Sequence, residues 1–453
     1  MRIGMVGTGY VGLVSGTCFA EFGHQVVCVD KDESKIERLK RGEIPIYEPG
    51  LEDLLKRQIE SGRIVFTTDI AQAVEGAQAV FIAVGTPSRR FGRDADLSYV
   101  YDAAREIARN MKDYTVVVNK STVPVGTACE VERIIREERP DADFDVASNP
   151  EFLREGAAIS DFMRPDRVVV GTASERAQEV MRGVYRPLYI NETPILFTQR
   201  ETAEVIKYAA NAFLATKITF INEIADLCEQ VGADVQQVAR GIGLDGRIGS
   251  KFLHAGPGYG GSCFPKDTLA LTRAGQKYSA PQRIVETVVS VNEDRKARMA
   301  DKIIAACGGD VRGKKIGILG LAFKPGTDDM RDAPALTIIP VLQQAGAHVA
   351  VYDPESMETA KPLLDGVEWC NGPYAVADNA DALALVTEWN EFRALDMQRL
   401  GEIMTRRCIV DLRNIYKVSE MKGKGFHYVS IGREEVFPEE AENMIPLSGA
   451  RQA

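Results

Sequence analysis

The sequence is poor in the residues that bind metals and in cysteines spaced to pair. Its 453 residues include four histidines, which stand apart from one another, and eight cysteines without CxxC spacing. Neither pattern suits a zinc site, so we expect no bound metal. Scattered cysteines of this kind are usually small buried apolar residues in a reducing compartment. Any redox chemistry must therefore depend on an organic cofactor.

Long apolar runs and an excess of positive charge are also missing. The longest runs, such as AVFIAVG at 79–85, are strand-sized and far too short to cross a membrane. The first residues, MRIGMVGTGYVG, lack the features of a signal peptide, so we expect a cytoplasmic protein. A net charge of −10 argues against binding to nucleic acid. We therefore expect neither a nucleic-acid partner nor a membrane partner.

What the sequence does contain is an alternation of strand-like and helix-like segments. A chain of this length is too long for one hydrophobic core, so two or three domains are expected. In its first part, apolar strand patterns alternate with helical ones, which is typical of a parallel, doubly wound sheet. The expected strands are 2–6, 24–30, 79–84, 115–122 and 144–150.

A long helical pattern follows at 199–230, uninterrupted by proline. An apolar helix of this kind can join two domains and often carries a subunit contact, so we expect a homodimer. A strand and glycine turn recur at 314–329, and GAHVAVYD at 346–353 mirrors GHQVVCVD at 23–30. We predict an α/β protein with two Rossmann-like, doubly wound domains joined by a central helical region with a long connecting helix. The predicted limits are 1–198, 199–310 and 311–436 for these three parts, with a polar tail at 437–453.

The first glycine turn predicts a dinucleotide site. Gly7, Gly9 and Gly12 form G-x-G-x-x-G directly after a strand and at the start of a helix. The first glycine allows a tight turn, the second lets backbone approach a pyrophosphate, and the third lets helix pack on strand. Asp30 ends the next strand, where a carboxylate binds ribose hydroxyls and repels a 2′-phosphate, which favours NAD. The alternative is an ordinary α/β turn without a ligand.

Cys263 lies in the glycine-rich stretch GPGYGGSCFPKD at 256–267. The residues after it read as a helix with Pro265 in the first turn. A thiol at a helix N-terminus has a lowered pKa, because backbone N–H groups and the helix dipole stabilise the thiolate. Lys266 adds positive charge. This is the pattern of a nucleophile, although a small buried residue remains the alternative, as for Cys18.

A nicotinamide site together with an activated cysteine suggests oxidation at the aldehyde level. The thiolate adds to an aldehyde, loss of hydride gives a thioester, and water then releases an acid. Asp267 shares a helix face with Cys263 if the helix has begun, and its carboxylate can act as a base or position water. A common first-turn helix acid is the alternative for Asp267.

Other polar residues lie where a cleft is expected. Lys207 and Asn211 are four residues apart on the long helix, and the pair can stabilise an alkoxide, or else form a solvated edge. Ligands of open parallel sheets bind outside the carboxyl ends of the strands, which places Thr122, Glu151 and Glu155 at the cleft. Ordinary turn chemistry is their alternative.

The motifs together resemble the UDP-glucose/GDP-mannose dehydrogenase family. The resemblance runs from Met1 to about Arg433 and rests on GTGYVG, VGTPS, KSTVPVG, NPEFLREGAA, KYAANAFLATKITFINE, GPGYGGSCFPKD and GLAFKPGTDDMRDAP. It implies an N-terminal NAD-binding domain, a central dimerisation region that carries the catalytic cysteine, and a C-terminal domain that binds the UDP-sugar. The implied reaction converts the C6 hydroxyl of UDP-glucose to a carboxylate, giving UDP-glucuronate, and reduces two NAD.

The resemblance also implies roles for single residues. Cys263 is the nucleophile, Lys207 and Asn211 hold the C6 oxygen, Asp267 and Thr122 position water, and Glu151 takes part in proton transfer or thioester hydrolysis. The implied NAD contacts are Gly7, Gly9, Tyr10, Val11, Gly12, Asp30, Lys35, Thr86, Thr122, Glu155, Lys266 and Arg331. The implied substrate contacts are Glu151, Phe152, Leu153, Lys207, Asn211, Arg247, Phe252, Leu253, His254, Ala255, Gly256, Gly260, Lys324 and Arg413. In the family, the arginine matching Arg247 can come from the neighbouring subunit.

Three alternatives stay open at this point. The same chemistry can act on GDP-mannose or on a UDP-N-acetylhexosamine. A single-hydride dehydrogenase of the hydroxyacid type shares the Rossmann start and a lysine in a helical middle, but it needs neither Cys263 nor a second Rossmann-like domain. A relative that binds NAD without turnover is the third alternative. The charged loop at 88–98 is given no catalytic role.

Overall fold

The computed structural model describes residues 1–87 and 95–438. Most of the charged loop predicted at 88–98, and the predicted polar tail from residue 439 on, lie outside this part of the chain. The chain divides into two compact units, Met1–Ala210 with Leu269–Pro281 and Asn211–Thr268 with Gln282–Ala453. The limits of the three predicted domains stay a prediction.

The first unit contains an eight-stranded sheet in the order β3-β2-β1-β4-β5-β6-β7-β8 among the described residues. Neighbouring strands run parallel, except that β6 and β7 are antiparallel. The order reverses between β1 and β4, and in doubly wound sheets a ligand binds at such a reversal. The strands are β1 (Arg2–Val6), β2 (Gln25–Val29), β3 (Ile64–Thr67), β4 (Ala79–Ile82), β5 (Thr115–Asn119), β6 (Phe144–Ser148), β7 (Val168–Gly171) and β8 (Ile195–Thr198).

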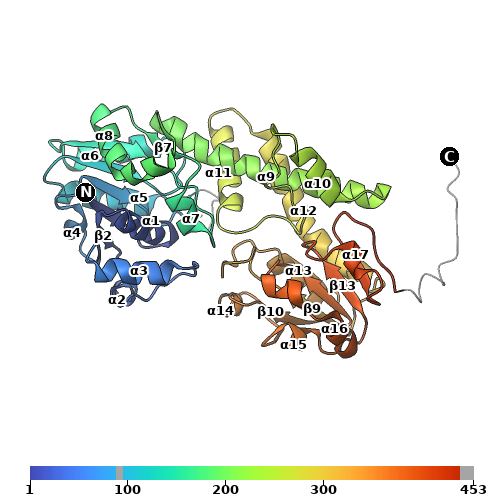
Figure 1. The fold of residues 1–453 in the computed structure, drawn as a ribbon. Coiled ribbons are helices and arrows are strands. Elements are labelled where there is room, and N and C mark those ends of the chain that lie inside the picture. The colour runs from blue at the N-terminus through green and yellow to red at the C-terminus, as the bar shows by residue number, and fades with distance from the viewer. Residues whose placement is uncertain (88–94, 439–453) are drawn as a thin grey trace. The chain divides into compact units, whose positions relative to one another are not determined.

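Both faces of this sheet are buried, as the parallel arrangement requires. Successive residues of one strand point to opposite faces, so Phe81 packs into one apolar cluster and Val80 and Ile82 into another. Figure 1 shows the helices of this unit around the sheet. They are α1 (Tyr10–Glu21), α2 (Glu33–Lys40), α3 (Leu51–Glu60), α4 (Ile70–Val74), α5 (Ser98–Asn110), α6 (Thr127–Glu138), α7 (Ala158–Met163), α8 (Glu175–Val184) and the 3-10 helix η1 (Arg186–Asn191).

The second unit repeats the same strand order in a smaller sheet. Within the described residues this sheet has six strands in the order β11-β10-β9-β12-β13-β14, and every pair is parallel. The two sheets and the long helix confirm the predicted fold class. The strands are β9 (Lys315–Leu319), β10 (His348–Tyr352), β11 (Glu368–Trp369), β12 (Ala382–Leu385), β13 (Cys408–Asp411) and β14 (His427–Ser430).

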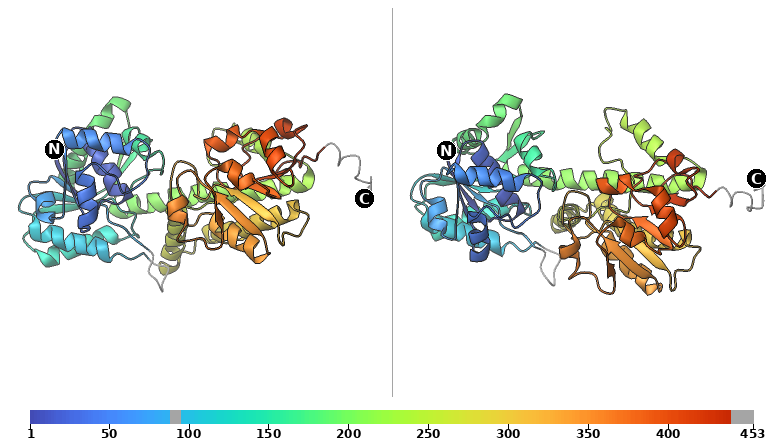
Figure 2. Two further views of the ribbon diagram at one scale, coloured as in Figure 1. Left: turned by 90° about the horizontal axis from the view of Figure 1, so that it is seen from below. Right: turned by 60° about the horizontal axis from the view of Figure 1, so that its bottom comes forward.

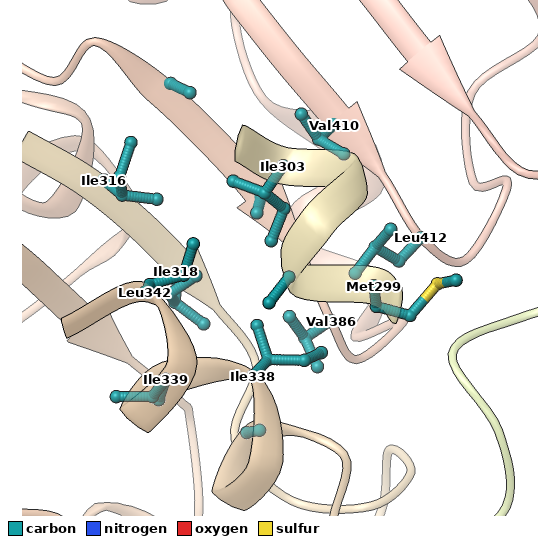
Figure 3. Close-up of a cluster of buried hydrophobic side chains, with 14 of the residues drawn as sticks. Met299, Ile303, Ile316, Ile318, Ile338, Ile339, Leu342, Val386, Val410 and Leu412 are labelled. Carbon is teal, nitrogen blue, oxygen red and sulfur yellow. The ribbon is translucent and has the colours of Figure 1, made fainter. Parts of the chain in front are cut away.

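The core of the second unit combines this sheet with a helix from the preceding segment. Figure 3 shows Ile303 of α12 (Arg283–Ala306) among apolar side chains of the sheet and of α13 (Ala335–Gln344), including Ile316, Val410 and Ile338. The other helices of the sheet domain are α14 (Met357–Ala360), α15 (Pro373–Ala377), the 3-10 helix η2 (Asn390–Ala394), α16 (Met397–Ile403) and α17 (Val418–Met421).

The long helix predicted at 199–230 is confirmed as α9 (Arg200–Val231). It is a single helix, as expected for a segment without proline, and Figure 2 shows it in green in two further views. The division into two units crosses α9 after Ala210 and α11 (Phe264–Lys277) after Thr268. The short helix α10 (Val235–Gly243) follows α9. No helix in the described part of the chain is apolar and long enough to span a membrane.

Several strands end earlier than the sequence predicts. The strand predicted at 115–122 is β5, which stops at Asn119. The backbone N–H groups of Lys120 and Ser121 both donate to the carbonyl of Ile82, at 2.9 and 3.0 Å, and this bends the chain away from the ladder. The polar residues at 120–122 therefore lie in a loop at the carboxyl end of the sheet.

Candidate active site

The three glycines of the first turn meet different surroundings. Gly7 has a φ of +101°, and a Cβ there would lie 2.6 Å from the carbonyl oxygen of Ala83. A Cβ on Gly12 would lie 2.0 Å from the oxygen of Gly7. Around Gly9, which caps α1, a Cβ would meet nothing within 4 Å. Close packing therefore requires glycine at Gly7 and Gly12. Around Gly9 the backbone at the N-terminus of α1 is free of close contacts, which suits the approach of a phosphate.

Asp30 lies directly after β2, as predicted, and joins the strand to this turn. Its carboxylate accepts hydrogen bonds from the N–H and hydroxyl of Thr8, at 2.9 and 2.7 Å, and from Lys35 at 2.8 Å. Burial would raise the pKa of Asp30, but Lys35, Thr8 and the N–H of Asp32 outweigh it and lower the pKa. Asp30 is therefore ionised at neutral pH and suited to accept from hydroxyl groups.

The difference between the glycines gives a first prediction. Gly9→Ala should leave the fold intact, because Gly9 has ordinary φ and ψ angles of −70° and −171° and free space around it. The added methyl group should occupy the position of a phosphate, so the affinity for NAD should fall by about tenfold or more. Calorimetric titration with NAD measures this change.

Gly12→Ala is the contrasting variant. Its methyl carbon would clash with the oxygen of Gly7, so this variant should lose stability before it loses affinity. An unchanged NAD affinity in a well-folded Gly9→Ala protein would contradict the assignment of this turn to the cofactor.

The loops after β4, β5 and β6 and the start of α1 carry further residues predicted for this unit. The Thr86 hydroxyl donates to the Thr122 carbonyl at 3.2 Å, which ties two of the loops together. Tyr10 donates to the buried carboxylate of Glu48. Glu48 also accepts from the N–H groups of Gly156 and Ala158, at 2.7 and 2.8 Å. Val11 packs against the core from α1, and Glu155 belongs to the loop that Glu48 holds.

Glu151 and Lys207 form a buried ion pair. Their charged atoms lie 3.1 Å apart, and the two side chains are 5% and 4% exposed. The N–H of Leu153 also donates to Glu151, at 2.5 Å. Burial would raise the pKa of Glu151, but Lys207, this N–H and Lys120 together lower it. Phe152 lies beside the pair, with the Lys207 nitrogen 5.3 Å from its ring centroid.

One turn before Lys207, Glu204 fixes α9 to the start of α6. Its carboxylate accepts from the N–H groups of Gly126 and Ala128, at 2.7 and 3.0 Å, at the start of α6. A helix N-terminus favours such a carboxylate, although burial raises the pKa of Glu204. Between these elements lies a cavity of about 10 Å³ lined by Thr122, Ser148, Glu204 and Lys207 among others. Its size suits a single water.

In the second unit, Cys263 occupies the position predicted for it, at the N-terminus of a helix. α11 starts at Phe264, and the N–H of Asp267 donates to the Cys263 carbonyl at 2.9 Å, so Cys263 caps the helix. It is partly exposed, whereas Cys18 and Cys28 are fully buried. Burial raises the pKa of both of those thiols. The exposure and helix-capping position of Cys263 therefore suit a nucleophile.

Asn211 and Asp267 meet in the same unit. The Asn211 amide donates to the Asp267 carboxylate at 2.6 Å, and Lys266 pairs with that carboxylate at 2.7 Å. Asp267 is 1% exposed. Two residues four apart on α9 therefore have different partners, since Lys207 contacts Glu151 and Asn211 contacts Asp267.

The glycine-rich stretch before Cys263 is held by buried polar side chains. Arg295 donates to the Gly256 carbonyl at 2.7 Å, and Asn222 accepts from the Gly256 N–H at 2.9 Å. Asn292 bonds both the N–H and the carbonyl of Tyr259, at 2.8 and 3.1 Å. This support fixes the loop that positions the thiol, as precise catalysis requires.

Close packing explains why this loop needs glycine. A Cβ on Gly260 would lie 2.3 Å from the Asp332 carbonyl oxygen, and one on Gly261 would lie 2.7 Å from the Phe323 ring. Gly260, a predicted substrate contact, is thus buried against the second glycine turn. Leu253 and Ala255 are buried as well, while His254 is exposed. Phe252 has a φ of 65°, which is rare for a bulky residue and is often found at functional sites.

The second glycine turn is built differently from the first. Asp353 takes the place of Asp30, but it is fully buried and accepts from the N–H groups of Leu321 and Ala322, at 2.7 and 3.1 Å. The carboxylate thus occupies turn N–H groups that a phosphate would need. No helix follows at once, since α13 starts at Ala335. The second turn therefore differs from the first in the two features that suit a phosphate, an open backbone and a helix that starts at the turn.

Lys324 and Arg413 lie near this second turn. The Lys324 nitrogen lies 5.3 Å from the Phe323 ring centroid. Arg413 follows β13 and donates to the carbonyls of Val386 and Phe323, at 2.7 and 2.8 Å. Arg413 therefore joins the loops at the carboxyl ends of this sheet, where a ligand of the second domain is expected.

Two predicted arginines have largely exposed side chains. The Arg247 side chain is 90% exposed and pairs with Asp245, two residues away. Arg331 is 64% exposed and pairs with Asp329. Their contacts within one chain do not show the substrate and NAD roles predicted for them.

Together these features define a class of protein. A dinucleotide-type turn, a Rossmann sheet order and a helix-capping cysteine are typical of an NAD-dependent dehydrogenase that uses a thiol. Three family models match the chain: the NAD binding domain of the UDP-glucose/GDP-mannose dehydrogenase family at residues 1–189, its central domain at 201–294 and its UDP binding domain at 317–418. The chain belongs to this family, and its cofactor is NAD.

Known proteins are similar to this chain over almost its whole length. A UDP-glucose 6-dehydrogenase of Rhizobium meliloti is 64% identical over 96% of this chain and 100% of its own. The structure of a UDP-glucose dehydrogenase from Pyrobaculum islandicum matches with a TM-score of 0.86 at 42% identity, covering 92% of this chain and 95% of its own. A UDP-D-ManNAc dehydrogenase from Pyrococcus horikoshii matches with a TM-score of 0.83 at 29% identity, covering 96% and 99%.

Sequence reasoning missed the residues that support those it predicted. Glu204 and Lys120 are buried near Lys207 and Glu151, and Asn292 and Arg295 hold the loop before Cys263. Lys120 and Glu204 gave a weak signal, since each is a charged residue within an apolar motif. The sequence contained no signal for Asn292 and Arg295, because they lie on a separate helix and resemble ordinary polar helix residues.

Proposed function

We propose that this chain oxidises the C6 hydroxyl of UDP-glucose to a carboxylate, giving UDP-glucuronate and reducing two NAD. The observation that carries the proposal is Cys263, a partly exposed thiol that caps α11 behind a buried glycine loop. Oxidation of an alcohol to a ketone or aldehyde needs no thiol, whereas oxidation to an acid gains from a covalent thioester. The choice of UDP-glucose is supported by the 64% identical relative.

The chemistry proceeds in two oxidations. NAD held at the first glycine turn would accept one hydride in each of them. In the first, the C6 hydroxyl loses a proton and a hydride and becomes an aldehyde. The Cys263 thiolate then adds to the aldehyde carbon, and the oxygen takes up a proton to give a thiohemiacetal. Loss of a second proton and hydride gives a thioester, and water cleaves its carbon–sulfur bond to release the acid and the thiol.

The charged and polar groups have distinct proposed roles in this sequence. Lys207 and Asn211 donate hydrogen bonds to the C6 oxygen and stabilise its negative charge. Glu151 is ionised and contacts Lys207, so it can accept a proton. Thr122 and Asp267 position water for thioester hydrolysis, and the water-sized cavity beside Thr122 and Lys207 supports this role.

The residues of the first turn fit NAD. Gly9 leaves its backbone open, and the Asp30 carboxylate is ionised and 17% exposed. The remaining proposed contacts are Gly7, Tyr10, Val11, Gly12, Lys35, Thr86, Thr122, Glu155, Lys266 and Arg331. For the sugar nucleotide they are Glu151, Phe152, Leu153, Lys207, Asn211, Arg247, Phe252, Leu253, His254, Ala255, Gly256, Gly260, Lys324 and Arg413. The division into three domains and a location in the cytoplasm are part of the same proposal. The eight free cysteines are consistent with a reducing compartment such as the cytoplasm.

The deciding experiment counts NADH formed per nucleotide sugar consumed. UDP-glucose, GDP-mannose and a UDP-N-acetylhexosamine are compared under the same conditions. We expect two NADH per UDP-glucose and little reaction with the others. A UDP-N-acetylhexosamine is a second candidate because of the Pyrococcus horikoshii structure, and a preference for it would change the substrate but keep the mechanism. One NADH with release of an aldehyde would contradict the covalent mechanism.

We also propose that the protein is a homodimer that associates through α9. Phe213, Phe220, Leu227 and Val231 are 65%, 49%, 56% and 66% exposed. Their spacing of seven, seven and four places them on one face of the helix. Such an uncovered apolar stripe on a helix fits the same stripe of a second copy. The exposed Arg247 side chain is consistent with a role at the neighbouring subunit.

The dimer gives a prediction for one substitution. Phe220→Glu puts a charge in the middle of the stripe, so the dimer should dissociate at concentrations where the wild type stays dimeric. Gln230→Glu adds the same charge at an exposed position off the stripe and should change nothing. Light scattering after size exclusion measures both masses. A monomeric wild type at micromolar concentration would refute the dimer.

A further inference from the structure

Lys120 is a buried lysine that the proposed mechanism leaves without a role. It directly follows β5, and its backbone is fixed by the bond from its N–H to the Ile82 carbonyl. The residue is 4% exposed. Lysine is rarely buried unless a carboxylate pairs with it, yet no carboxylate in the described ranges, 1–87 and 95–438, lies within ion-pair distance of its nitrogen. Burying a charge without an ion-pair partner is unfavourable, so the presence of Lys120 at this position needs an explanation.

The direct partners of Lys120 are neutral. Its ammonium donates to the Asn149 side-chain oxygen and to the Tyr185 hydroxyl, both at 3.2 Å. Tyr185 also donates to Asn149 at 2.5 Å, and the Asn149 amide donates to the Val169 carbonyl at 2.8 Å. The rings of Phe162 and Tyr185 lie 5.8 and 5.9 Å from the nitrogen. Lys120 therefore holds Asn149, which lies two residues before Glu151.

The nearby full charges are Glu151 and Lys207. Burial lowers the pKa of Lys120 to about 8, with Glu151 opposing this shift and Lys207 adding to it. In turn Lys120 helps to lower the pKa of Glu151, after Lys207 and the Leu153 N–H. The three buried side chains thus form one cluster with two positive charges and one negative charge. The other groups facing Lys120 are neutral: Asn149, Tyr185 and Phe162.

We propose that Lys120 is a positioning residue for the oxidation, which fixes Asn149 and supplies the second positive charge that keeps Glu151 ionised beside Lys207. Without it, Lys207 would have to neutralise Glu151 and stabilise the C6 oxygen with the same charge. With it, the cluster keeps a net positive charge toward the substrate oxygen. This proposal rests on the function proposed above for Lys207 and Glu151.

The test separates the charge of Lys120 from its hydrogen bonds. Lys120→Gln keeps a donor but removes the charge, with Lys120→Met as a second neutral variant if the first is unstable. Tyr185→Phe is the control, since it removes a hydrogen bond of Lys120 but keeps the charge. The protonated Glu151 carboxyl is followed by infrared spectroscopy from about pH 7 to about pH 3, a range that includes the lowered pKa of the wild type. Its band is assigned by its loss when Glu151→Gln is added to each variant.

We expect the neutral Lys120 variants to protonate Glu151 at a pH about one unit or more above the wild type. Their kcat should fall by about tenfold or more. Tyr185→Phe should move neither the Glu151 titration nor kcat to this extent. A Glu151 titration unchanged in the neutral variants would overturn the proposal. So would a loss of kcat no larger than that of Tyr185→Phe.

The infrared titration does not depend on turnover. It therefore decides the charge role of Lys120 even if the proposed substrate is wrong. The kcat comparison is made on whichever nucleotide sugar the wild type oxidises. Failure of the substrate assignment and failure of the Lys120 proposal are thus distinguishable.

Discussion

Replacing Cys263 by serine should abolish net conversion of UDP-glucose to UDP-glucuronate. We expect a loss of roughly a thousandfold or more in kcat, because a hydroxyl at this position does not form the thioester. The fold should be retained, since serine is itself a favourable residue at a helix N-terminus. NAD binding should also be retained, because Cys263 is not among the proposed contacts of NAD. NADH formation measures the rate, and calorimetry measures the binding.

Cys129→Ser is the matched control for this substitution. Cys129 is the exposed cysteine at the start of α6, so it tests whether loss of an accessible thiol by itself has an effect. It should keep full activity. Near-normal steady-state turnover of Cys263→Ser would rule out the covalent mechanism.

Replacing Lys207 by alanine should give the second large effect. The variant loses the ammonium that we propose stabilises the C6 oxygen, so kcat should fall by about a hundredfold or more. KM should change much less, because the contact acts mainly in the transition state. The variant should also lose about 3 kcal/mol of stability, since Glu151 is left buried without its ion-pair partner.

A double variant separates the two effects of Lys207. Lys207→Ala with Glu151→Gln removes both charges of the pair, so it should recover stability but not rate. Denaturant unfolding and steady-state kinetics measure the two quantities. Recovery of the rate as well, or a pure rise in KM for Lys207→Ala, would move Lys207 from catalysis to binding.

The stability cost of Lys207→Ala should also depend on pH. The pKa of Glu151 in the folded wild type lies below its usual value of 4.5. The stabilisation from this group is therefore fully present above 4.5 and is lost as the pH falls through the folded pKa. In Lys207→Ala this pKa rises, so the stability difference from the wild type should shrink as the pH falls from the raised pKa of the variant to the lowered pKa of the wild type, as denaturant unfolding at a series of pH values measures.

Much of the fold could be predicted from the sequence because its signals are local. The turn from β1 to α1 follows from three glycines within six residues, and α9 from an uninterrupted helical pattern. The two Rossmann-like sheets follow from a strand and turn pattern that recurs. The predicted strand ends were less accurate. For example, β5 ends early because the N–H groups of Lys120 and Ser121 both donate to the carbonyl of Ile82.

The sequence predicted single residues of the candidate site, but it did not predict which of them contact one another. Cys263 could be placed at the start of a helix, since proline, glycine and helical pattern are all nearby in the chain. The pairing of Glu151 with Lys207 joins residues 56 apart in sequence. The pairing of Asn211 with Asp267 spans 56 residues as well. No periodicity or spacing specifies such a contact.

The sequence by itself therefore determined the kinds of elements, the cofactor turn and the position of Cys263 at the start of a helix. Each of these depends on residues that are neighbours along the chain. Only the tertiary structure decided which charges are buried together. It placed Lys120 near Glu151 and Lys207, and it set Asn292 and Arg295 against the loop before Cys263. Burial and pairing are properties of side chains brought together by packing, so they follow from the folded core and not from local pattern.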